Sequence, residues 1–176
     1  MLSLVREHGL TADKVQGLEA WIHQRRLQHT NRPQPGSALD AKFSLQYVLV
    51  RALLDGHVSL AHFEGQAHTD PRVQALLPRI KVAAYDDSQF APSNHFGGAV
   101  RVTLKDGSVL QASVEQALGR TSAHPLPQHL LQAKFALCAA GVLQDGAIEA
   151  VATAVERIED ISNMRQLSEQ LARVQI

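Results

Sequence analysis

The sequence has very little cysteine, and that scarcity excludes two classes of small protein. Cys138 is the single cysteine of the 176 residues, so no internal disulfide can form, and neither a CxxC pair nor any other cysteine metal-binding spacing exists. A disulfide-stapled secreted scaffold and a cysteine zinc site are therefore both excluded. We expect a reducing compartment, and cytoplasmic localisation fits it best.

Long apolar runs and an excess of one charge are also absent. No stretch of about 18 apolar residues occurs that could cross a bilayer, and the first eight residues lack the basic start and apolar centre of a signal peptide. The 17 Lys and Arg residues are balanced by 17 Asp and Glu residues, and aromatic residues make up only 5%. Without a basic field or a basic-aromatic surface pattern, we expect neither nucleic acid nor a membrane as a partner.

What remains is typical of a globular chain. Hydrophobic residues make up 45% of the sequence, and a chain of this length buries roughly 70% of its extended surface on folding. That is enough for one full core or for two small ones. Periodicity and breakers divide the chain into an α+β part and an all-helical tail.

Four strands are predicted in the first two-thirds of the chain. The segment 15–23 alternates apolar and polar residues, as does 80–85, and the segments 100–105 and 108–114 flank the turn Asp106-Gly107, which is a strong hairpin signal. Phe96-Gly97-Gly98 is interpreted as the start of the third strand. We expect a mostly antiparallel four-stranded sheet with packed helices.

Two helices among these strands carry clear terminal signals. A single buried helix is predicted over 37–54, with Ser37 and Asp40 as a capping pair and Gly56 as its left-handed stop. Asp70-Pro71 predicts a second helix start, with an N-cap followed by a proline in the first turn.

The tail is predicted to be three amphipathic helices with apolar stripes at helical spacing. The stripes consist of Leu130, Leu131, Phe135 and Cys138; of Ile148, Val151, Ala152, Val155 and Ile158; and of Met164, Leu167, Leu171 and Val174. Because the periodicity changes abruptly near Gly119, we expect this tail to dock on another surface.

The strongest candidate site is the start of the buried helix. Lys42 in its first turns, with Arg32 before it and the hydroxyls of Ser44 and Tyr47 after it, would form a compact anion site suited to a carboxylate substrate. The alternative is that Lys42 lays its stem over the core and points its amine to water, while Tyr47 is a core aromatic.

Two other groups offer weaker candidates. His62, Glu64, His68 and Asp70 lie within nine residues, but they lack a metal-ligand spacing, so a solvated loop is the better interpretation. Cys138 lies on an apolar helix with no histidine nearby and is interpreted as a small buried thiol rather than a nucleophile.

Several runs resemble the MmgE/PrpD family over essentially the whole chain, and the cluster 31–56 is the most specific of them. In chain order the matching runs are Asn31-Arg32-Pro33, Ala41-Lys42-Phe43-Ser44-Leu45-Gln46-Tyr47, Ala52-Leu53-Leu54-Asp55-Gly56, Asp70-Pro71-Arg72-Val73, Val102-Thr103-Leu104-Lys105-Asp106-Gly107, Gly119, Pro125-Leu126 and Lys134-Phe135.

The resemblance implies a cofactor-free lyase that acts on a small di- or tricarboxylate such as 2-methylcitrate. It implies that residues 1–119 correspond to an α+β lid and residues 120–176 to the C-terminal helices that return to a helical domain. It also implies that Tyr47 is an active-site tyrosine that hydrogen-bonds or relays a proton, that Lys42 occupies a basic position of the site, and that Arg32 and Lys42 bind substrate carboxylates.

The family's remaining catalytic groups belong to an N-terminal helical segment to which nothing in this sequence corresponds. Since positioning and acid-base groups from both sides of the cleft are needed, we expect the chain to be inactive alone. It is then either the C-terminal piece of a lyase that works with a separate N-terminal helical subunit, or a non-catalytic remnant that acts as a homo-oligomer or interaction module.

Overall fold

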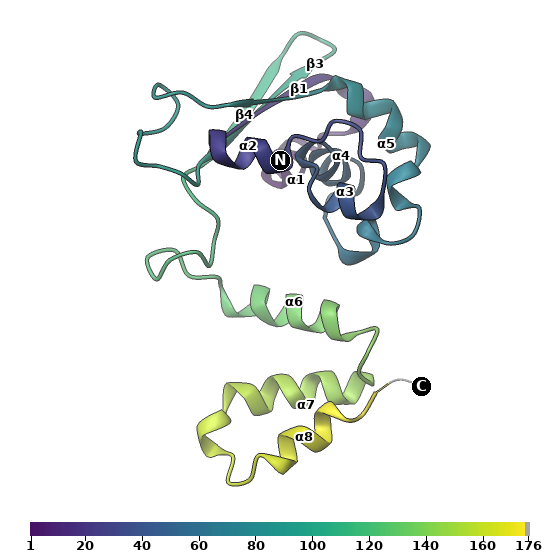
Figure 1. Cartoon of the computed structure of the whole chain (residues 1–176), viewed down its shortest axis with the longest axis vertical. Coiled ribbons are helices and arrows are strands. Elements are labelled where there is room, and N and C mark those ends of the chain that lie inside the picture. Colours follow the sequence, from purple (N-terminus) through teal and green to yellow (C-terminus); the bar gives the residue numbers. More distant parts are fainter. Residues whose placement is uncertain (175–176) are drawn as a thin grey trace. The chain divides into compact units, whose positions relative to one another are not determined.

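The computed structural model describes residues 1–174, and the chain divides into two compact units, Met1–Ala117 and Leu118–Ile176 (Figure 1). Unit 1 combines a sheet with helices, and unit 2 is built from helices. The predicted α+β class and the helical character of the tail are confirmed.

The sheet of unit 1 contains β1 (Val15–Ile22), β2 (Ile80–Ala84), β3 (Gly98–Leu104) and β4 (Val109–Val114) in the order β2-β1-β3-β4. β1 pairs with β2 in parallel and with β3 antiparallel, and β3 pairs antiparallel with β4. The sheet is therefore mixed, and the expectation of a mostly antiparallel sheet was wrong. The cause is the helical connection between β1 and β2, since a crossover of this kind returns the chain in the same direction.

The period of two in β1 sets the two faces of the sheet. Leu18 and Val102 are paired neighbours on β1 and β3, and both are buried on the core side. Glu19 pairs with Arg101 on the opposite face, where the Arg101 guanidinium also lies 5.0 Å from the centre of the Trp21 ring. This alternation is what a sheet covered on one face requires.

Helices cover the core face of this sheet (Figure 1). The bounds of the helices are α1 (Leu2–His8), α2 (Gln24–Thr30), α3 (Ala38–Lys42), α4 (Leu45–Asp55) and α5 (Pro71–Leu76), with 3-10 turns at Ala12–Lys14, Leu60–Phe63, Ala67–Thr69 and Leu77–Arg79. Tyr47 and Val50 of α4 are fully buried and pack in the same cluster as Leu18. The predicted signals at Asp70, Pro71 and Gly56 are confirmed as the N-cap, first turn and left-handed stop of their helices.

The predicted helix over 37–54 is in fact two helices. Ser37 caps α3 by accepting a hydrogen bond from the Asp40 amide, α3 ends at Lys42, and Ser44 caps α4 by accepting from the Tyr47 amide. A serine that offers its hydroxyl to the backbone two or three residues on competes with a continuous helix. The chain therefore breaks at Phe43 and starts α4 afresh.

Unit 2 contains α6 (Gln128–Ala139), α7 (Asp145–Glu156), the 3-10 turn Ile158–Asp160 and α8 (Arg165–Leu171). Its core is small and consists of Ala139, Leu143, Ala147, Val151 and Leu167. Many other apolar side chains of the predicted stripes are exposed. They include Leu131, Val155, Ile158, Met164 and Leu171.

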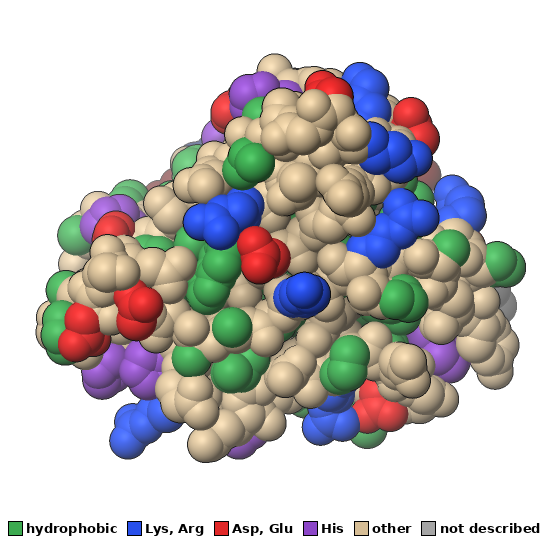
Figure 2. All heavy atoms as spheres, turned by 90° about the horizontal axis from the view of Figure 1, so that it is seen from above, with side chains coloured by type: hydrophobic (Ala, Val, Ile, Leu, Met, Phe, Trp, Pro, Cys, Tyr) green, Lys and Arg blue, Asp and Glu red, His purple; other side chains and the backbone are tan. Residues whose placement is uncertain are grey.

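Surface charge follows the balanced composition. Figure 2 shows Lys and Arg side chains interspersed with Asp and Glu side chains over the face in view. Within residues 1–174, no helix combines the length and the apolar character needed to cross a membrane.

Candidate functional site

The candidate site lies where the loop 31–36 meets α3 and α4. Ser44 is buried at this corner, where its hydroxyl donates to the Arg32 carbonyl oxygen at 2.6 Å and accepts from the Tyr47 amide at 3.0 Å. One side chain therefore both starts α4 and fixes the preceding loop. The hydrogen-bonding capacity of Ser44 is used by the fold.

Gln46 fixes the same loop from the next turn. It is 2% exposed, and its side-chain nitrogen donates to Asn31 Oδ1 at 2.6 Å. Its side-chain oxygen is buried without a hydrogen-bond partner among the residues described. Buried acceptors without a hydrogen-bond donor are uncommon in folded proteins. The Gln46 side-chain oxygen, beside Asn31, is one of them.

Arg32 is half exposed and already has a counter-ion. Its guanidinium nitrogen lies 2.5 Å from Asp40 Oδ1, and the group stacks over the Phe43 ring at 5.7 Å. The structure thus brings Arg32 and Ser44 into contact. It also neutralises much of the Arg32 charge with a carboxylate from the first turn of α3.

Lys42 is exposed at the C-terminal end of α3, not in the first turns of a buried helix. Its ammonium group has no hydrogen bond or ion pair within residues 1–174, as far as these are described. A helix C-terminus carries partial negative charge and favours a cation. Lys42 can therefore contact an anion. However, the partial positive charge of a helix N-terminus, which the sequence analysis predicted beside it, is absent at this end of α3.

Tyr47 lies inside unit 1, apart from the exposed Lys42. Its side chain is fully buried, its hydroxyl donates to the carbonyl oxygen of His62, and it accepts from Arg51 Nε at 3.1 Å. The ring also packs against Phe63. Both hydrogen-bonding roles of the hydroxyl are filled by protein groups.

Arg51 is the functional-looking residue that the sequence interpretation missed. It is 4% exposed, donates to the Ala67 carbonyl oxygen at 2.6 Å, and has ion pairs with Asp55 at 3.3 Å and Asp70 at 3.2 Å. A buried cation that is paired and hydrogen-bonded holds its partners in place. The sequence did carry a signal for this residue. Arg51 lies four residues after Tyr47 and four residues before Asp55, so the three side chains share one face of the helix, and the other residues between Leu45 and Leu54 carry no charge.

The pKa values of Asp70 and His62, two neighbours of Arg51, are both lowered from their usual values. The Asp70 pKa falls from the usual 3.8 to about 2, chiefly because the Arg72 side chain and amide donate to its carboxylate, with Arg51 adding attraction. The His62 pKa is lowered by desolvation and then by Arg51 and His57, against the opposing pull of Asp55. His62 is thus disposed to stay neutral beside the buried guanidinium.

The side chains gathered at this corner include the cations Arg32 and Lys42 and the buried hydroxyls of Ser44 and Tyr47. Within residues 1–174, no group of three or more His, Cys, Asp or Glu side chains is placed to hold a metal ion. Asp70 caps α5 instead, and Cys138 is exposed on α6, contrary to the prediction that it is buried. Among the described residues of this corner, Lys42 has no counter-ion, Arg32 pairs with Asp40, and the buried hydroxyls of Ser44 and Tyr47 donate to backbone carbonyl oxygens.

Comparison with known proteins gives a consistent result. The sequence model of the MmgE/PrpD C-terminal domain matches residues 1–160. Cis-aconitate decarboxylase of Mus musculus is 32% identical over 143 residues, which cover 81% of this chain and 29% of that protein. The mitochondrial 2-methylcitrate dehydratase of Yarrowia lipolytica is 25% identical over 168 residues, covering 91% of this chain and 32% of that enzyme.

The same pattern holds for a bacterial relative. The 2-methylcitrate dehydratase of Salmonella typhimurium is 27% identical over 139 residues, covering 73% of this chain and 28% of that enzyme. This chain therefore spans about three-tenths of the length of the relatives it matches. Because the family model covers nearly the whole sequence, the chain belongs to the MmgE/PrpD family and corresponds to its C-terminal part.

Proposed function

We propose that this chain forms the C-terminal part of a cofactor-independent lyase, of the dehydratase or decarboxylase type, that acts on a small di- or tricarboxylate such as 2-methylcitrate. The family match over residues 1–160 carries the proposal. The relatives named cis-aconitate decarboxylase and 2-methylcitrate dehydratase support the substrate class. Residues 1–119 would act as the lid-like domain and 120–176 as the C-terminal helices.

Within this proposal, Lys42 and Arg32 bind substrate carboxylates. Lys42 offers an unpaired, exposed ammonium group, and Arg32 would exchange its contact with Asp40 for the substrate. Ser44 holds the loop that carries Arg32. The assignment favours Lys42 as the stronger contact, because its charge has no competing carboxylate to displace.

Tyr47 would hydrogen-bond the reacting group or relay a proton. For this role its hydroxyl must leave the His62 carbonyl, which belongs to the 3-10 turn Leu60–Phe63. The hydroxyl would keep its contact with Arg51 Nε at 3.1 Å. The proposed role therefore requires movement of that turn when substrate binds.

The remaining catalytic groups would come from a helical segment equivalent to the other seven-tenths of the relatives' length. Removal of a proton beside a carboxylate needs a positioned base as well as charge stabilisation, and no described group near Lys42 provides both. We therefore propose that the chain is inactive without that segment, and that it works in the cytoplasm.

The exposed apolar helices of unit 2 support a second candidate, an oligomerisation or interaction module. A groove of about 270 Å³ between α6 and α7 is lined mainly by apolar side chains, Phe135 and Val151 among them. At its rim Leu131 is 57% and Val155 is 52% exposed. Apolar grooves of this kind mark contact surfaces, either for a second copy of the chain or for the helical segment of the lyase.

Reconstitution tests the lyase proposal. The chain is co-expressed with a polypeptide covering the rest of the Salmonella typhimurium enzyme, and the complex is assayed for loss of water from 2-methylcitrate. We expect turnover only when both parts are present, and a drop in kcat/KM of about tenfold or more in Lys42→Ala. Lys81→Ala, at an exposed lysine of β2, is the matched control.

The outcomes separate the two candidates. A complex that forms but shows no turnover of 2-methylcitrate, citrate or cis-aconitate contradicts the lyase proposal. Light scattering on the chain alone tests the second candidate, because a clean monomer at high concentration excludes self-association.

A further inference from the structure

A second group of basic residues lies at the end of β1, outside the site described above. A pocket of about 280 Å³ is lined by His23, Arg25, Arg26, His29, His95 and Phe96. Five of these six side chains are basic, and no acidic residue lines the pocket in the described part of the chain. Its volume is at the small end of ligand sites, which start near about 300 Å³.

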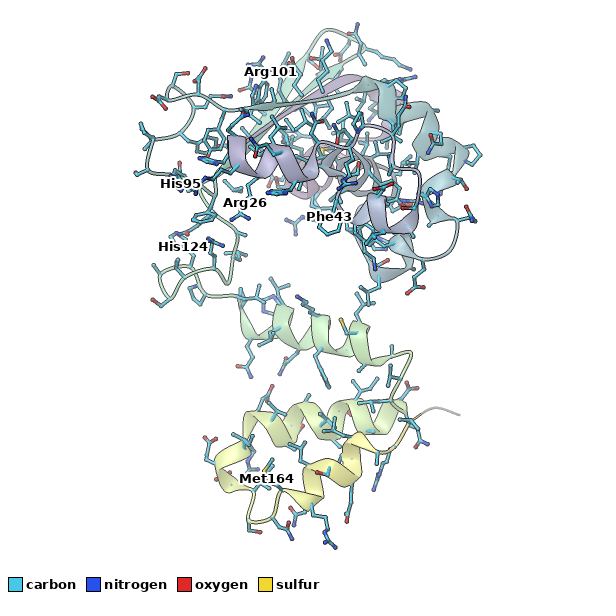
Figure 3. All side chains as sticks on the ribbon, viewed as in Figure 1. Arg26, Phe43, His95, Arg101, His124 and Met164 are labelled. Atoms are coloured by element: carbon cyan, nitrogen blue, oxygen red, sulfur yellow. The ribbon has the colours of Figure 1, made fainter. Side chains whose placement is uncertain are left out.

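One wall of the pocket is formed by His23 and α2. His23 Nδ1 accepts a hydrogen bond from the Arg25 amide at 3.1 Å, so a neutral His23 ring carries its proton on Nε2. The ring packs 4.7 Å from the ring of His95 and edge-on to Tyr85 at 5.7 Å. Figure 3 shows Arg26 of α2 and His95 of the loop before β3 on neighbouring segments, with Arg101 on the sheet away from them.

The opposite wall is a loop that is firmly held. Asn94 Oδ1 accepts from the amides of Phe96 and Gly97, both at 2.8 Å, and the Asn94 carbonyl accepts from the Tyr85 hydroxyl at 2.5 Å. Gly97 packs so closely on Phe90 that an added Cβ would lie 2.6 Å from its ring. The backbone that carries His95 and Phe96 is thus held by hydrogen bonds and by packing within the protein.

The side chains are oriented as well. The Arg26 guanidinium lies over the Phe96 ring, 5.4 Å from its centre. Stacking of this kind leaves the edge of the guanidinium, with its N–H donors, free to meet an oxyanion. The pocket therefore presents a planar donor group on an aromatic support.

No carboxylate among the described residues lines the pocket or acts on the pKa of His23. The His23 pKa is lowered by desolvation and then by His95, Arg25 and Arg26, and no acidic group acts on it in the opposite direction. Two acidic residues lie near the segments that form the pocket: the Glu115 carboxylate accepts from the side chain of Asn94, and the Asp86 carboxylate accepts from Ser88. Protonation of His23 is therefore unfavourable until a negative ligand is present.

We propose that this pocket binds a small multivalent oxyanion, a polycarboxylate or a phosphate, through Arg25, Arg26 and the imidazoles of His23 and His95. The guanidinium groups supply permanent charge and directed donors. The histidines add charge when they protonate, so binding strengthens as the pH falls through the histidine range. The inference does not depend on the lyase proposal, because its residues are different ones.

The test is an anion titration of the full chain followed by NMR of the histidine ring protons. Citrate and inorganic phosphate are the two probes, each measured at pH 6 and pH 8. We expect the His23 and His95 signals to shift, the His23 pKa to rise with ligand, and binding to be tighter at pH 6. Arg26→Gln should weaken binding by about tenfold or more.

Two controls make the result decisive. Arg101→Gln removes the same charge from the sheet of unit 1 outside the pocket and should leave binding unchanged. Tighter binding of citrate or of phosphate identifies the ligand class, and either supports the site. Unmoved histidine signals, or equal weakening by Arg26→Gln and Arg101→Gln, overturn it, and loss of binding in Lys42→Ala alone assigns the anion to the other cluster.

Discussion

Replacing Asp70 by asparagine tests whether the charge network around Arg51 stabilises unit 1. Asn caps helices about as well as Asp, so Asp70→Asn should keep the N-cap bond to the Arg72 amide at the start of α5. What it removes is the negative charge that pairs with Arg72 at 2.7 Å and with Arg51 at 3.2 Å. The variant therefore measures the contribution of the Asp70 charge to stability separately from that of the N-cap hydrogen bond.

The expected magnitude follows from the pKa of Asp70. A fall from the usual 3.8 to about 2 corresponds to roughly 2.5 kcal/mol at about 1.4 kcal/mol per pKa unit. The Arg72 side chain is 63% exposed, so solvent screens part of that attraction. We expect Asp70→Asn to lower the free energy of unfolding by about 1 to 2 kcal/mol at pH 7.

The pH dependence gives the sharper test. Because the folded pKa is depressed, the stabilisation is fully present above the unfolded value of 3.8 and is lost as the pH falls through about 2. The deficit of Asp70→Asn should therefore be constant from pH 7 to about pH 5 and shrink below about pH 4.

Trp21 provides the measurement, since it is the chain's single tryptophan and lies in β1 of unit 1. Urea unfolding followed by its fluorescence reports on that unit at each pH. A deficit that stays the same down to pH 2.5, or one below a few tenths of a kcal/mol at pH 7, would refute the electrostatic account of this network.

Two further substitutions probe buried contacts of unit 1 by the same unfolding assay. Tyr47→Phe leaves Arg51 Nε without its 3.1 Å acceptor and should cost about 1 to 3 kcal/mol; an unchanged stability would mean that the hydroxyl is not held as described. Gly97→Ala places a methyl group against Phe90 and should cost about 1 to 3 kcal/mol, whereas Gly141→Ala, with nothing within 4 Å of the added carbon, should leave the Trp21 transition unmoved.

Much of unit 1 could be predicted because its signals are local. The Asp106-Gly107 turn, the Asp70-Pro71 helix start and the Gly56 stop each depend on residues within one turn of the chain. The direction of β2 relative to β1 does not depend on the strands themselves. Helices connect these two strands, and a helical connection favours parallel pairing. The parallel direction of β2 was therefore predictable from the helices between the strands, but not from the apolar-polar alternation within each strand.

The candidate site was harder to predict because one serine changes its geometry. Ser44 was interpreted as a ligand-binding hydroxyl inside a helix, but it caps α4, and the preceding helix α3 ends at Lys42. Lys42 thereby moves from a helix start to a helix end. A capping serine seven residues after another capping serine is a local signal, and it indicates two short helices.

The two clusters of basic residues in unit 1 differ in how they are assembled: one comes from a single stretch of sequence, and the other from two distant segments. Arg32 and Lys42 are close in sequence, but Asp40 from the same segment neutralises Arg32. The residues of the basic pocket come from 23–29 and 95–96, segments about seventy positions apart that β1 and β3 bring together. Neither segment alone carries enough basic residues to predict an anion site from the sequence. In the described structure, no acidic residue lines the pocket. If the chain binds a polycarboxylate by itself, the several basic side chains that line the His23–His95 pocket favour it over the single exposed Lys42, and the comparison of Arg26→Gln with Lys42→Ala separates the two.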